Sequence, residues 1–401
     1  MKILFLTSRF PFPPIGGDKL RFFNILKYLS RNHKISILCF TDRKIQPGII
    51  SAYRDYFSEI DVVFLPKICS YINCILGLLK GQPLQVSYYQ SKKMEKLVRE
   101  KLSQDKFDMV FVHLIRMAEY VKDYKIYKIL DMTDAQSLNY TRAMSYTTGK
   151  WSIIHRFEKE LVLGYEKNIW RYFDKTYVVS PVDQHYLKSL DNNMNIEVLP
   201  NGVDVQKYTF RLSDHQNKQI CFIGNMRTFP NTDAVVWFCR EIFPMIKKEI
   251  PEAKFYIVGT EPSRRVRQLS KIKDVYVTGE VPNVNEYVWN SAVSVAPIRV
   301  GAGIQNKILE SMALGTPVVT TSIGLEGIEA LPDEHLLVAD SPEEFARTVV
   351  QLIREKELRM QISQKARNLI EEKYTWDNMF SPLGRILVSN NNLFKLKSKK
   401  K

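Results

Sequence analysis

A lysine and a glutamate lie three positions apart directly after a glycine-bearing loop, and this arrangement can bind a phosphorylated sugar. Lys307 and Glu310 share one face of a predicted helix that begins at about Ile304. Its unpaired N–H groups attract phosphate, and the lysine can neutralise phosphate charge while the carboxylate accepts hydrogen bonds from a ribose diol. The alternative is an ordinary crossover whose two charges form a solvated pair. The loop itself consists of Gly301, Ala302 and Gly303.

Three further side chains with chemical potential follow predicted strands. The run FDMVFVH ends at His113, and KILDMTD carries Asp131 and Asp134. Ligands of parallel sheets bind beyond the carboxyl ends of the strands. The three residues can therefore position sugar or acceptor hydroxyls, with general-base work for one of them. A packing histidine, a helix N-cap and a surface charge are the alternatives.

Two more glycine-containing loops place bare backbone beside predicted strands. Gly16 and Gly17 separate a strand at 2–7 from a helix at Lys19–Leu29, where a phosphate or sugar could approach. Simple loop flexibility is the alternative, and without a GxGxxG fingerprint a nicotinamide cofactor is not indicated. A third loop follows Gly224 and contains Asn225 and Arg227.

The elements around these residues alternate between apolar strands and helical stretches, which predicts α/β domains with parallel sheets and helices on both faces. The turn sequence Pro200-Asn201-Gly202 separates two such patterns and marks the junction. A long amphipathic helix is predicted over Trp151–Phe173. Its apolar residues are expected to belong mostly to the core, and the alternative is that its basic, aromatic face touches a membrane. The predicted strands are Lys34–Phe40, Asp61–Leu65, Phe107–His113, Tyr127–Asp131, Phe173–Ser180, Gln219–Gly224, Lys254–Gly259, Val275–Thr278, Val293–Ile298 and His335–Ala339.

Length, cysteine content and net charge limit the kinds of protein that this sequence can encode. The chain has 401 residues, 45% of them hydrophobic and 25% charged, which suits two domains with separate cores. Five cysteines without a CxxC pair suggest neither disulfides nor zinc, and we expect a cytoplasmic protein without a transmembrane run. The net charge of +15 suits phosphorylated substrates or an anionic membrane, and no nucleic-acid-binding motif is present. The lysine-rich end, Lys395–Lys401, is either a lipid-attracted or a solvated tail.

The segment GAGIQNKILESMALGTPVVTT resembles the donor-binding segment of retaining nucleotide-sugar glycosyltransferases of the group 1 or family 4 type. PNGVD at 200–204, GEVP at 279–282 and YTWDNMF at 374–380 extend the resemblance along the chain. It implies the GT-B architecture, in which two Rossmann-like doubly wound domains face a central cleft. The implied parts are an acceptor-side domain at 1–203, a nucleotide-sugar-binding domain at 204–375, a helix at about 376–390 crossing back, and a basic tail at 391–401.

The resemblance also implies roles for single residues. His113 would lie near the transferred sugar, and the loop with Glu280 and Val281 would pair with the nucleobase edge. Arg227 would hold the donor diphosphate, with Arg299 as a substitute where relatives carry a lysine and this chain has Asn231. The predicted donor-binding residues are Gly16, Gly17, Gly224, Asn225, Arg227, Glu280, Val281, Arg299, Gly301, Ala302, Gly303, Ile304, Lys307 and Glu310.

The implied reaction is transfer of a glycosyl group from a nucleoside diphosphate sugar to a glycan or lipid-linked acceptor, with retention of configuration. Helix dipoles, loop amides and basic side chains can stabilise the diphosphate leaving group without a metal, and the sequence has no Asp-x-Asp triplet. We therefore expect neither a metal nor a cofactor.

The sequence motifs GIQNK and ILESMALG are most similar to those of a subgroup associated with bacterial exopolysaccharide and PEP-CTERM/exosortase systems. This implies polysaccharide or lipid-linked oligosaccharide assembly at the inner face of the membrane. Two alternatives stay open. One is an epimerase or hydrolase of nucleotide sugars. The other is an inactive nucleotide-sugar-binding protein, suggested by Ala302, which stands where many relatives have a glutamate.

Overall fold

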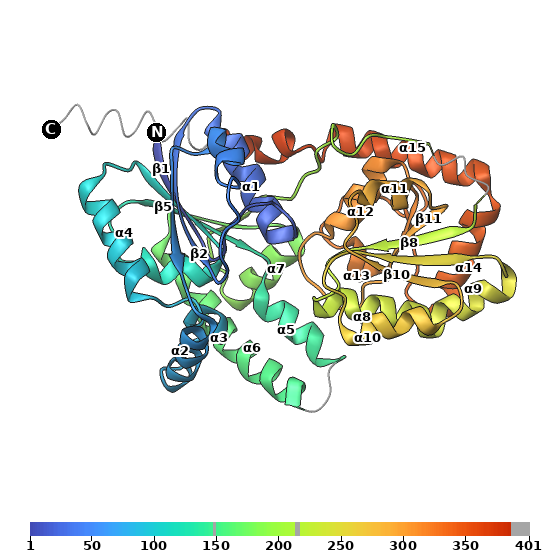
Figure 1. Cartoon of the computed structure of the whole chain (residues 1–401), viewed down its shortest axis with the longest axis horizontal. Coiled ribbons are helices and arrows are strands. Elements are labelled where there is room, and N and C mark those ends of the chain that lie inside the picture. The colour runs from blue at the N-terminus through green and yellow to red at the C-terminus, as the bar shows by residue number, and fades with distance from the viewer. Residues whose placement is uncertain (147–149, 213–216, 386–401) are drawn as a thin grey trace. The chain divides into compact units, whose positions relative to one another are not determined.

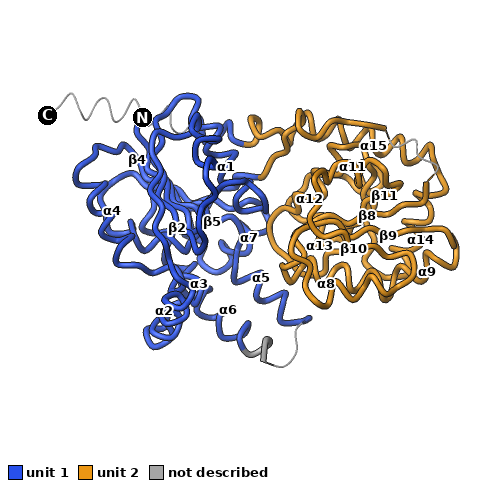
Figure 2. The backbone as a smooth tube through the Cα atoms, viewed as in Figure 1, with its two compact units in different colours: residues 1–200, 380–401 blue, residues 201–379 orange. Residues whose placement is uncertain are grey.

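The chain forms two compact units. The computed structural model describes residues 1–146, 150–212 and 217–385. Unit 1 comprises Met1–Pro200 and the chain from Phe380 onward, and unit 2 comprises Asn201–Met379 (Figure 2). The division falls within the Pro200-Asn201-Gly202 turn. The predicted basic tail at 391–401, and the end of the helix predicted at 376–390, lie outside the described residues.

Unit 1 is built on a seven-stranded sheet in the order β3-β2-β1-β4-β5-β6-β7, with every neighbouring pair parallel. The central strands β1 and β4 are almost continuously apolar because helices cover both faces of the sheet. Figure 1 shows α1 and α4 on opposite faces. The strands are β1 (Lys2–Thr7), β2 (Lys34–Thr41), β3 (Glu59–Phe64), β4 (Met109–His113), β5 (Tyr127–Thr133), β6 (Lys175–Val178) and β7 (Ile196–Val198). The helices are α1 (Gly17–Ser30), α2 (Lys67–Leu79), α3 (Leu84–Ser87), α4 (Lys92–Gln104), α5 (Gln136–Met144), α6 (Lys150–Ile169) and α7 (Pro181–Leu190).

Unit 2 repeats this plan with six parallel strands in the order β10-β9-β8-β11-β12-β13. In Figure 1, α8 and α10 lie on one face of the sheet, and α11 and α12 lie on the other. The strands are β8 (Gln219–Ile223), β9 (Lys254–Val258), β10 (Val275–Gly279), β11 (Val293–Ala296), β12 (Val318–Thr320) and β13 (Leu337–Val338). The helices are α8 (Phe229–Trp237), α9 (Phe243–Glu249), α10 (Arg264–Arg267), α11 (Val284–Trp289), α12 (Asn306–Leu314), α13 (Ser322–Leu325), α14 (Pro342–Arg354) and α15 (Lys356–Glu372). The predicted α/β class with two doubly wound parallel sheets is confirmed.

Each sheet has one place where the strand order reverses, and loops diverge there to leave room for a ligand. In unit 1 the reversal lies between β1 and β4, and in unit 2 between β8 and β11. The loops after these four strands carry most of the residues selected from the sequence, among them His113, Gly224 and Gly301. In each unit, the topology therefore brings predicted site residues from two separate loops to the same edge of the sheet.

Three predicted helices have other bounds in the structure. The helix expected at Lys19–Leu29 runs from Gly17 to Ser30, so Gly17 is its first residue rather than part of the loop. The helix expected from about Ile304 begins at Asn306, because Gly303 has a positive φ of 73° and Gln305 is extended. The loop between β11 and α12 is therefore longer than predicted. The helix expected over Trp151–Phe173 ends at Ile169 and continues as a 3-10 turn to Tyr172.

Helix α2 docks on α3 through small residues. A Cβ atom added to Gly77 would lie 1.9 Å from Ser87 Oγ and 2.5 Å from Ser87 Cβ. The Asn73 amide also donates to the Gln90 carbonyl oxygen at 2.8 Å. Only glycine permits this approach, so the contact fixes which side of α2 faces the domain. Among the described residues, no helix is long and apolar enough to cross a membrane.

We expect Gly77→Ala and Gly164→Ala to change helix stability in opposite directions. The alanine at 77 must displace Ser87, so the opening free energy of α2 should fall by about 1–2 kcal/mol. Gly164 lies within α6 with nothing within 4 Å of an added Cβ, so alanine there should stabilise α6 by about 0.5–1 kcal/mol. Native-state hydrogen exchange of the two helices measures both values. Equal effects of the two substitutions would contradict the close packing of α2 on α3.

Candidate functional site

The loops after β8 and β9 meet through two glycines. A Cβ atom on Gly259 would lie 1.7 Å from the Gly224 carbonyl oxygen, and Gly259 has a φ of 150°. The Gly224 amide donates a hydrogen bond to the Val258 carbonyl oxygen at 3.0 Å. Neither position accepts a side chain without displacing its surroundings, so bare backbone lines the reversal point of the unit 2 sheet.

Lys307 extends from α12 toward this glycine pair. Its Nζ donates to Gln305 Oε1 at 2.8 Å and lies 5.6 Å from the Phe222 ring centroid. Its Cε lies 3.5 Å from the position that a Cβ on Gly224 would occupy. Burial lowers the pKa of the Lys307 ammonium to about 8, and the charge of Glu310 opposes this only in part. A nearby phosphate would favour the charged form.

Glu310, one turn further along α12, has a different partner. Its carboxylate is hydrogen-bonded to the Tyr208 hydroxyl, yet burial raises the pKa of the carboxyl above its usual value. Burial also raises the pKa of the Tyr208 phenol, with a further contribution from Glu310. Because both side chains are half-buried and have separate partners, Lys307 and Glu310 are not a solvated surface pair.

The basic residues predicted to hold a diphosphate occupy contrasting settings. The Arg227 side chain is 69% exposed and lies 3.7 Å from Glu261. Arg299 forms a bidentate pair with Asp233 at 2.8 and 3.0 Å, and its guanidinium carbon lies 4.8 Å from the Trp237 ring centroid. Arg227 is therefore presented to solvent, whereas Arg299 is held against α8.

Asn231, which stands where the family resemblance leads one to expect a lysine, has a structural role. Its amide donates to the Asn225 carbonyl oxygen at 2.9 Å, and the Asn225 side chain accepts the Arg227 amide at 2.9 Å. These bonds close the loop after β8. They place Arg227 at the tip of a turn fixed by its own backbone.

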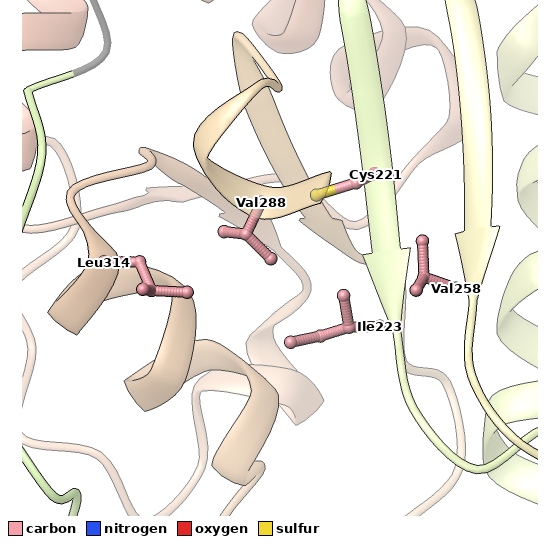
Figure 3. Close-up of a cluster of buried hydrophobic side chains, with 5 residues drawn as sticks. All are labelled: Cys221, Ile223, Val258, Val288 and Leu314. Atoms are coloured by element: carbon pink, nitrogen blue, oxygen red, sulfur yellow. The ribbon is translucent and has the colours of Figure 1, made fainter. Parts of the chain in front are cut away.

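The remaining predicted donor residues line the ends of β10 and β11. Glu280 is exposed, and Val281 packs against a cluster that lies beside β8 and β9 (Figure 3). Ile304 is buried, Ala302 is half-buried, and an added Cβ on Gly301 would lie 3.2 Å from Gln305 Nε2. The buried cluster consists of Cys221, Ile223, Val258, Val288 and Leu314, with Tyr208 also packed on it.

In unit 1, the end of β5 holds a fully buried ion pair. Asp131 accepts two hydrogen bonds from Arg21 of α1, each at 2.8 Å, and both side chains are 0% exposed. The ring of His113, at the end of β4, lies 3.0 Å from Asp131 through Nδ1. Burial alone would raise the pKa of the Asp131 carboxyl, but the charge of Arg21 and the bond from His113 hold it well below its usual value. This geometry suits a carboxylate that positions the histidine ring.

The second nitrogen of His113 also has a partner. Nε2 lies 3.1 Å from the carbonyl oxygen of Asp18, the second residue of α1. Because a carboxylate and a carbonyl oxygen can only accept, both contacts are full hydrogen bonds when the ring is an imidazolium. Gly16, with a φ of 96°, and Gly17 start this helix and expose backbone beside the ring.

Asp134 belongs to a group of acids at the start of α5. Its pKa is raised well above the usual value by burial and by the charge of Asp183. Asp183 accepts the Ala135 amide at 2.9 Å, and Glu166 accepts the Gln136 amide at 2.7 Å. Burial raises the pKa of Glu166 to about 7. The α5 N-terminus is thus capped by protein carboxylates, and Asp134 is the half-buried member of the group.

Strained backbone marks the same strand ends. Leu114, after β4, has a φ of 70°, and Thr133, at the end of β5, has a φ of 68°. Such values cost about 1–3 kcal/mol for residues with a Cβ and tend to occur at functional sites. They turn the chain sharply beside His113 and Asp131.

Sequence reasoning missed three contributors to these arrangements. Arg21 carried a weak signal, since it is a charged residue between Leu20 and Phe22 in the sequence. Asp18 acts through its carbonyl oxygen, which leaves no signal in residue type. Tyr208 lies in the linker before β8, far in sequence from Glu310.

We expect Asp131→Asn to destabilise unit 1 by about 3 kcal/mol, because it leaves the charge of Arg21 buried without its compensating carboxylate. The lowered pKa of Asp131 makes its contribution to folding stability fully present above the unfolded-state value of about 4, and the contribution is lost as pH falls toward the folded-state value. Urea unfolding across this acidic range should show a weaker pH dependence in the variant. Asp105→Asn, which breaks a solvent-screened pair with Lys2, should cost much less. Equal losses in the two variants would show that the Arg21 pair is not decisive.

Residues 217–355 match the family model described as Glycosyl transferases group 1. The match covers β8 to α14 and includes Lys307 and Glu310. It therefore falls on the part of unit 2 in which the glycine pair and the two charged residues converge.

Relatives extend over nearly the whole chain. An uncharacterized 44.6 kDa protein in the cps region of Klebsiella pneumoniae is 23% identical over 95% of this chain and 98% of its own. Sucrose-phosphate synthase from Thermosynechococcus elongatus has a TM-score of 0.74 at 13% identity, covering 98% of this chain and 99% of its own. HepE from Anabaena, in complex with UDP, has a TM-score of 0.68 at 14% identity, covering 97% of this chain and 100% of its own. The chain thus has the GT-B fold, and with the group 1 glycosyl transferase match in unit 2 this supports a glycosyltransferase.

Proposed function

We propose that the protein is a retaining glycosyltransferase that moves a sugar from a nucleoside diphosphate sugar to a glycan or lipid-linked acceptor. The observation that carries the proposal is the placement of Lys307 and Glu310 at the reversal point of the unit 2 sheet, beside bare glycine backbone. Unit 2 thereby combines a cation, a hydrogen-bond acceptor and close backbone approach. These are the groups that a diphosphate and a ribose diol require.

In this proposal the donor is bound by unit 2. Lys307 and the amides of Gly301–Gly303 contact the diphosphate, Glu310 accepts the ribose hydroxyls, and Tyr208 orients that carboxylate. Arg227 contributes an exposed positive charge from the loop after β8. Glu280 and Val281 border the nucleobase, and the buried cluster on which Val281 packs supports this loop from below. UDP and UDP-glucose are present in complexes of HepE, which supports a nucleotide of this class.

The acceptor half of the reaction is assigned to unit 1. His113, whose two ring nitrogens are held by Asp131 and the Asp18 carbonyl oxygen, contributes by fixing the start of α1 and the glycine loop before it, beside which an acceptor would bind. Asp134, whose raised pKa favours the protonated form, can exchange a proton with a hydroxyl. Arg21 holds Asp131 in place and is a positioning residue.

The reaction is proposed to need no metal and no cofactor. Lysine, arginine and loop amides supply the positive potential that the leaving diphosphate requires. Among the described residues, no group of three or more His, Cys, Asp or Glu side chains is placed to hold a metal ion. Metal independence stays a prediction that a chelator can test.

The proposed setting is exopolysaccharide or other cell-surface polysaccharide synthesis, on the inner face of the cell membrane. Two observations support this setting. The GIQNKILESMALG motif resembles the exopolysaccharide-associated subgroup, and a relative of the chain is a protein in a cps region. The high positive charge of the chain favours peripheral contact with anionic lipid.

Glu310→Ala should weaken nucleotide binding at least about tenfold, or 1.4 kcal/mol, because the ribose loses its acceptor. Calorimetric titration with UDP, GDP, ADP and dTDP in the presence of EDTA measures this on wild type and variant. Glu357→Ala, which removes an exposed glutamate of α15, is the matched control and should bind as wild type does.

The outcomes of this titration separate the competing functions. Absence of binding to every nucleotide, or equal binding by Glu310→Ala, overturns the proposed donor site. Binding that appears only after a divalent ion is added overturns metal independence. Turnover of the donor sugar without an acceptor would favour an epimerase or hydrolase, and binding without turnover across an acceptor panel would favour an inactive binding protein.

Diphosphate binding should also be coupled to proton uptake. With the Lys307 pKa near 8, about half of the side chains are neutral at pH 8, and a bound phosphate should restore their charge. Titrations in two buffers of different ionisation enthalpy should therefore show uptake of up to about 0.5 proton at pH 8 and almost none at pH 6. Lys307→Met should abolish the uptake, and Lys365→Met, on the surface of α15, should retain it. Uptake that persists without Lys307 would assign the proton to another group.

A further inference from the structure

Helix α2 exposes its large apolar side chains and buries its small ones. Half of the exposed large hydrophobic side chains in the described part of the chain lie within Phe64–Leu79. Ile68 is 74% exposed and Leu79 is 82% exposed. The residues at helical spacing along the outer side form the apolar stripe, which consists of Ile68, Tyr71, Ile72, Ile75, Leu76 and Leu79.

The inner side of α2 is specifically fitted to the domain, so the exposure of the stripe is a fixed feature. Gly77 and Ser70 are buried, and Gly77 packs so closely on Ser87 of α3 that no larger residue fits. Asn73 and Cys74 bond to the carbonyl oxygens of Gln90 and Leu84. Rotating α2 to bury the stripe would break all of these contacts.

Helix α3, on which α2 rests, is itself anchored. The Leu84 and Gln85 amides donate to the Glu158 carboxylate of α6 at 2.9 and 3.2 Å. Glu158 is buried, which raises the pKa of its carboxyl despite these bonds. The platform under α2 is therefore part of the unit 1 structure, and Figure 1 shows α2 and α3 side by side at its margin.

The charges along α2 and the segments next to it in sequence are basic, although Lys67 also lies 3.4 Å from the Asp42 carboxylate. Between Asp61 and Glu95 the sequence contains no acidic residue, while Lys67 and Lys80 flank α2 at its two ends. Lys92 and Lys93 follow at the start of α4. An apolar face bordered by lysines is complementary to acyl chains under anionic head groups.

We propose that α2 is a membrane-docking helix whose apolar stripe inserts into the interface of an anionic lipid bilayer. This assignment rests on the peripheral-membrane part of the proposed function and names the element responsible. A helix of 13 residues is about 20 Å long, shorter than the roughly 30 Å hydrocarbon core, so α2 lies in the plane of the interface. A second copy of the chain fits less well, since a symmetric interface would bring the same lysines together and α2 itself carries no acidic residue to oppose them.

The sequence had suggested the helix at Trp151–Phe173 for such a contact. In the described part of α6, Ile154 and Phe157 are exposed, at 40% and 51%. Helix α2 presents a longer continuous apolar face and has no acidic residue, whereas α6 contains Glu160 within the same face region. The stripe of α2 is thus the stronger insertion element of unit 1.

Binding of the full chain to vesicles tests the proposal. We expect co-sedimentation with phosphatidylcholine vesicles that contain phosphatidylglycerol, and weaker binding without it. Ile72→Asp/Ile75→Asp should lower the partition coefficient at least about tenfold, since two charges would enter the acyl region. The matched control, Tyr276→Asp/Leu331→Asp, replaces exposed apolar residues of unit 2 and should bind as wild type does.

A probe on α2 separates insertion from attraction by any other part of the chain. Cys69 is exposed on α2, whereas Cys39, Cys221 and Cys239 are buried and Cys74 is half-buried. An environment-sensitive fluorophore on Cys69 should shift to the blue on vesicle binding and be quenched by lipids brominated in the acyl chain. Labelling of the Cys69→Ser variant measures how much fluorophore attaches to other cysteines. A probe attached to Leu331→Cys in the Cys69→Ser background should stay unquenched when the protein binds vesicles.

Three results would overturn the proposal. These are equal vesicle binding by Ile72→Asp/Ile75→Asp, an unshifted probe on bound protein, and a concentration-dependent dimer that the same substitutions dissociate. The last result would identify a second copy as the occupant of the stripe. Titration with UDP keeps the two proposals distinct, because a wild-type chain that binds nucleotide but no anionic vesicles refutes docking alone. Vesicle binding without any nucleotide binding refutes the donor site alone.

Discussion

The buried pair between Arg21 and Asp131 is the interaction on which the unit 1 site depends. Removing two charges from water costs several kcal/mol for each ion, so the pair is tolerated only because its geometry is bidentate and His113 adds a further bond. These contacts tie α1 to the ends of β4 and β5. The glycine loop before α1 and the two strained turns at Leu114 and Thr133 are therefore fixed relative to one another, which keeps the histidine ring in one orientation.

The two units treat their charged residues in opposite ways. In unit 1 the pKa of Asp131 is lowered, so the charged form is already compensated by its neighbours. In unit 2 the pKa of Lys307 is lowered and that of Glu310 is raised, so both groups are shifted toward neutrality. A diphosphate would place negative charge beside Lys307, and the hydroxyls of a ribose diol would donate hydrogen bonds to Glu310. The charges of unit 1 are thus already compensated by protein groups, whereas those of unit 2 can be compensated by a donor nucleotide.

The local part of this arrangement could be predicted from the sequence. Apolar runs between helical stretches indicated the parallel sheets, and Lys307 and Glu310 were evident from their spacing after glycines. Contacts between distant segments were not evident. Arg21 and Asp131 are 110 positions apart in the sequence. Only the fold reveals that the second turn of α1 contacts the carboxyl end of β5. The start of α12 was misjudged because the positive φ of Gly303 extends the loop by residues that otherwise favour a helix.

Helix α2 shows why an amphipathic pattern alone does not tell which side is buried. Its sequence predicts an apolar helix, and a helix optimised for stability would turn the large residues inward, where each contributes about 1.5–3 kcal/mol on burial. The inward side instead carries Ser70, Asn73, Cys74 and Gly77, because α3 approaches too closely for anything larger. Water is a poor environment for a stripe of six large apolar side chains. The packing that forces them outward therefore makes sense only if another apolar phase covers them, and the lysines at both ends indicate one with a negative surface.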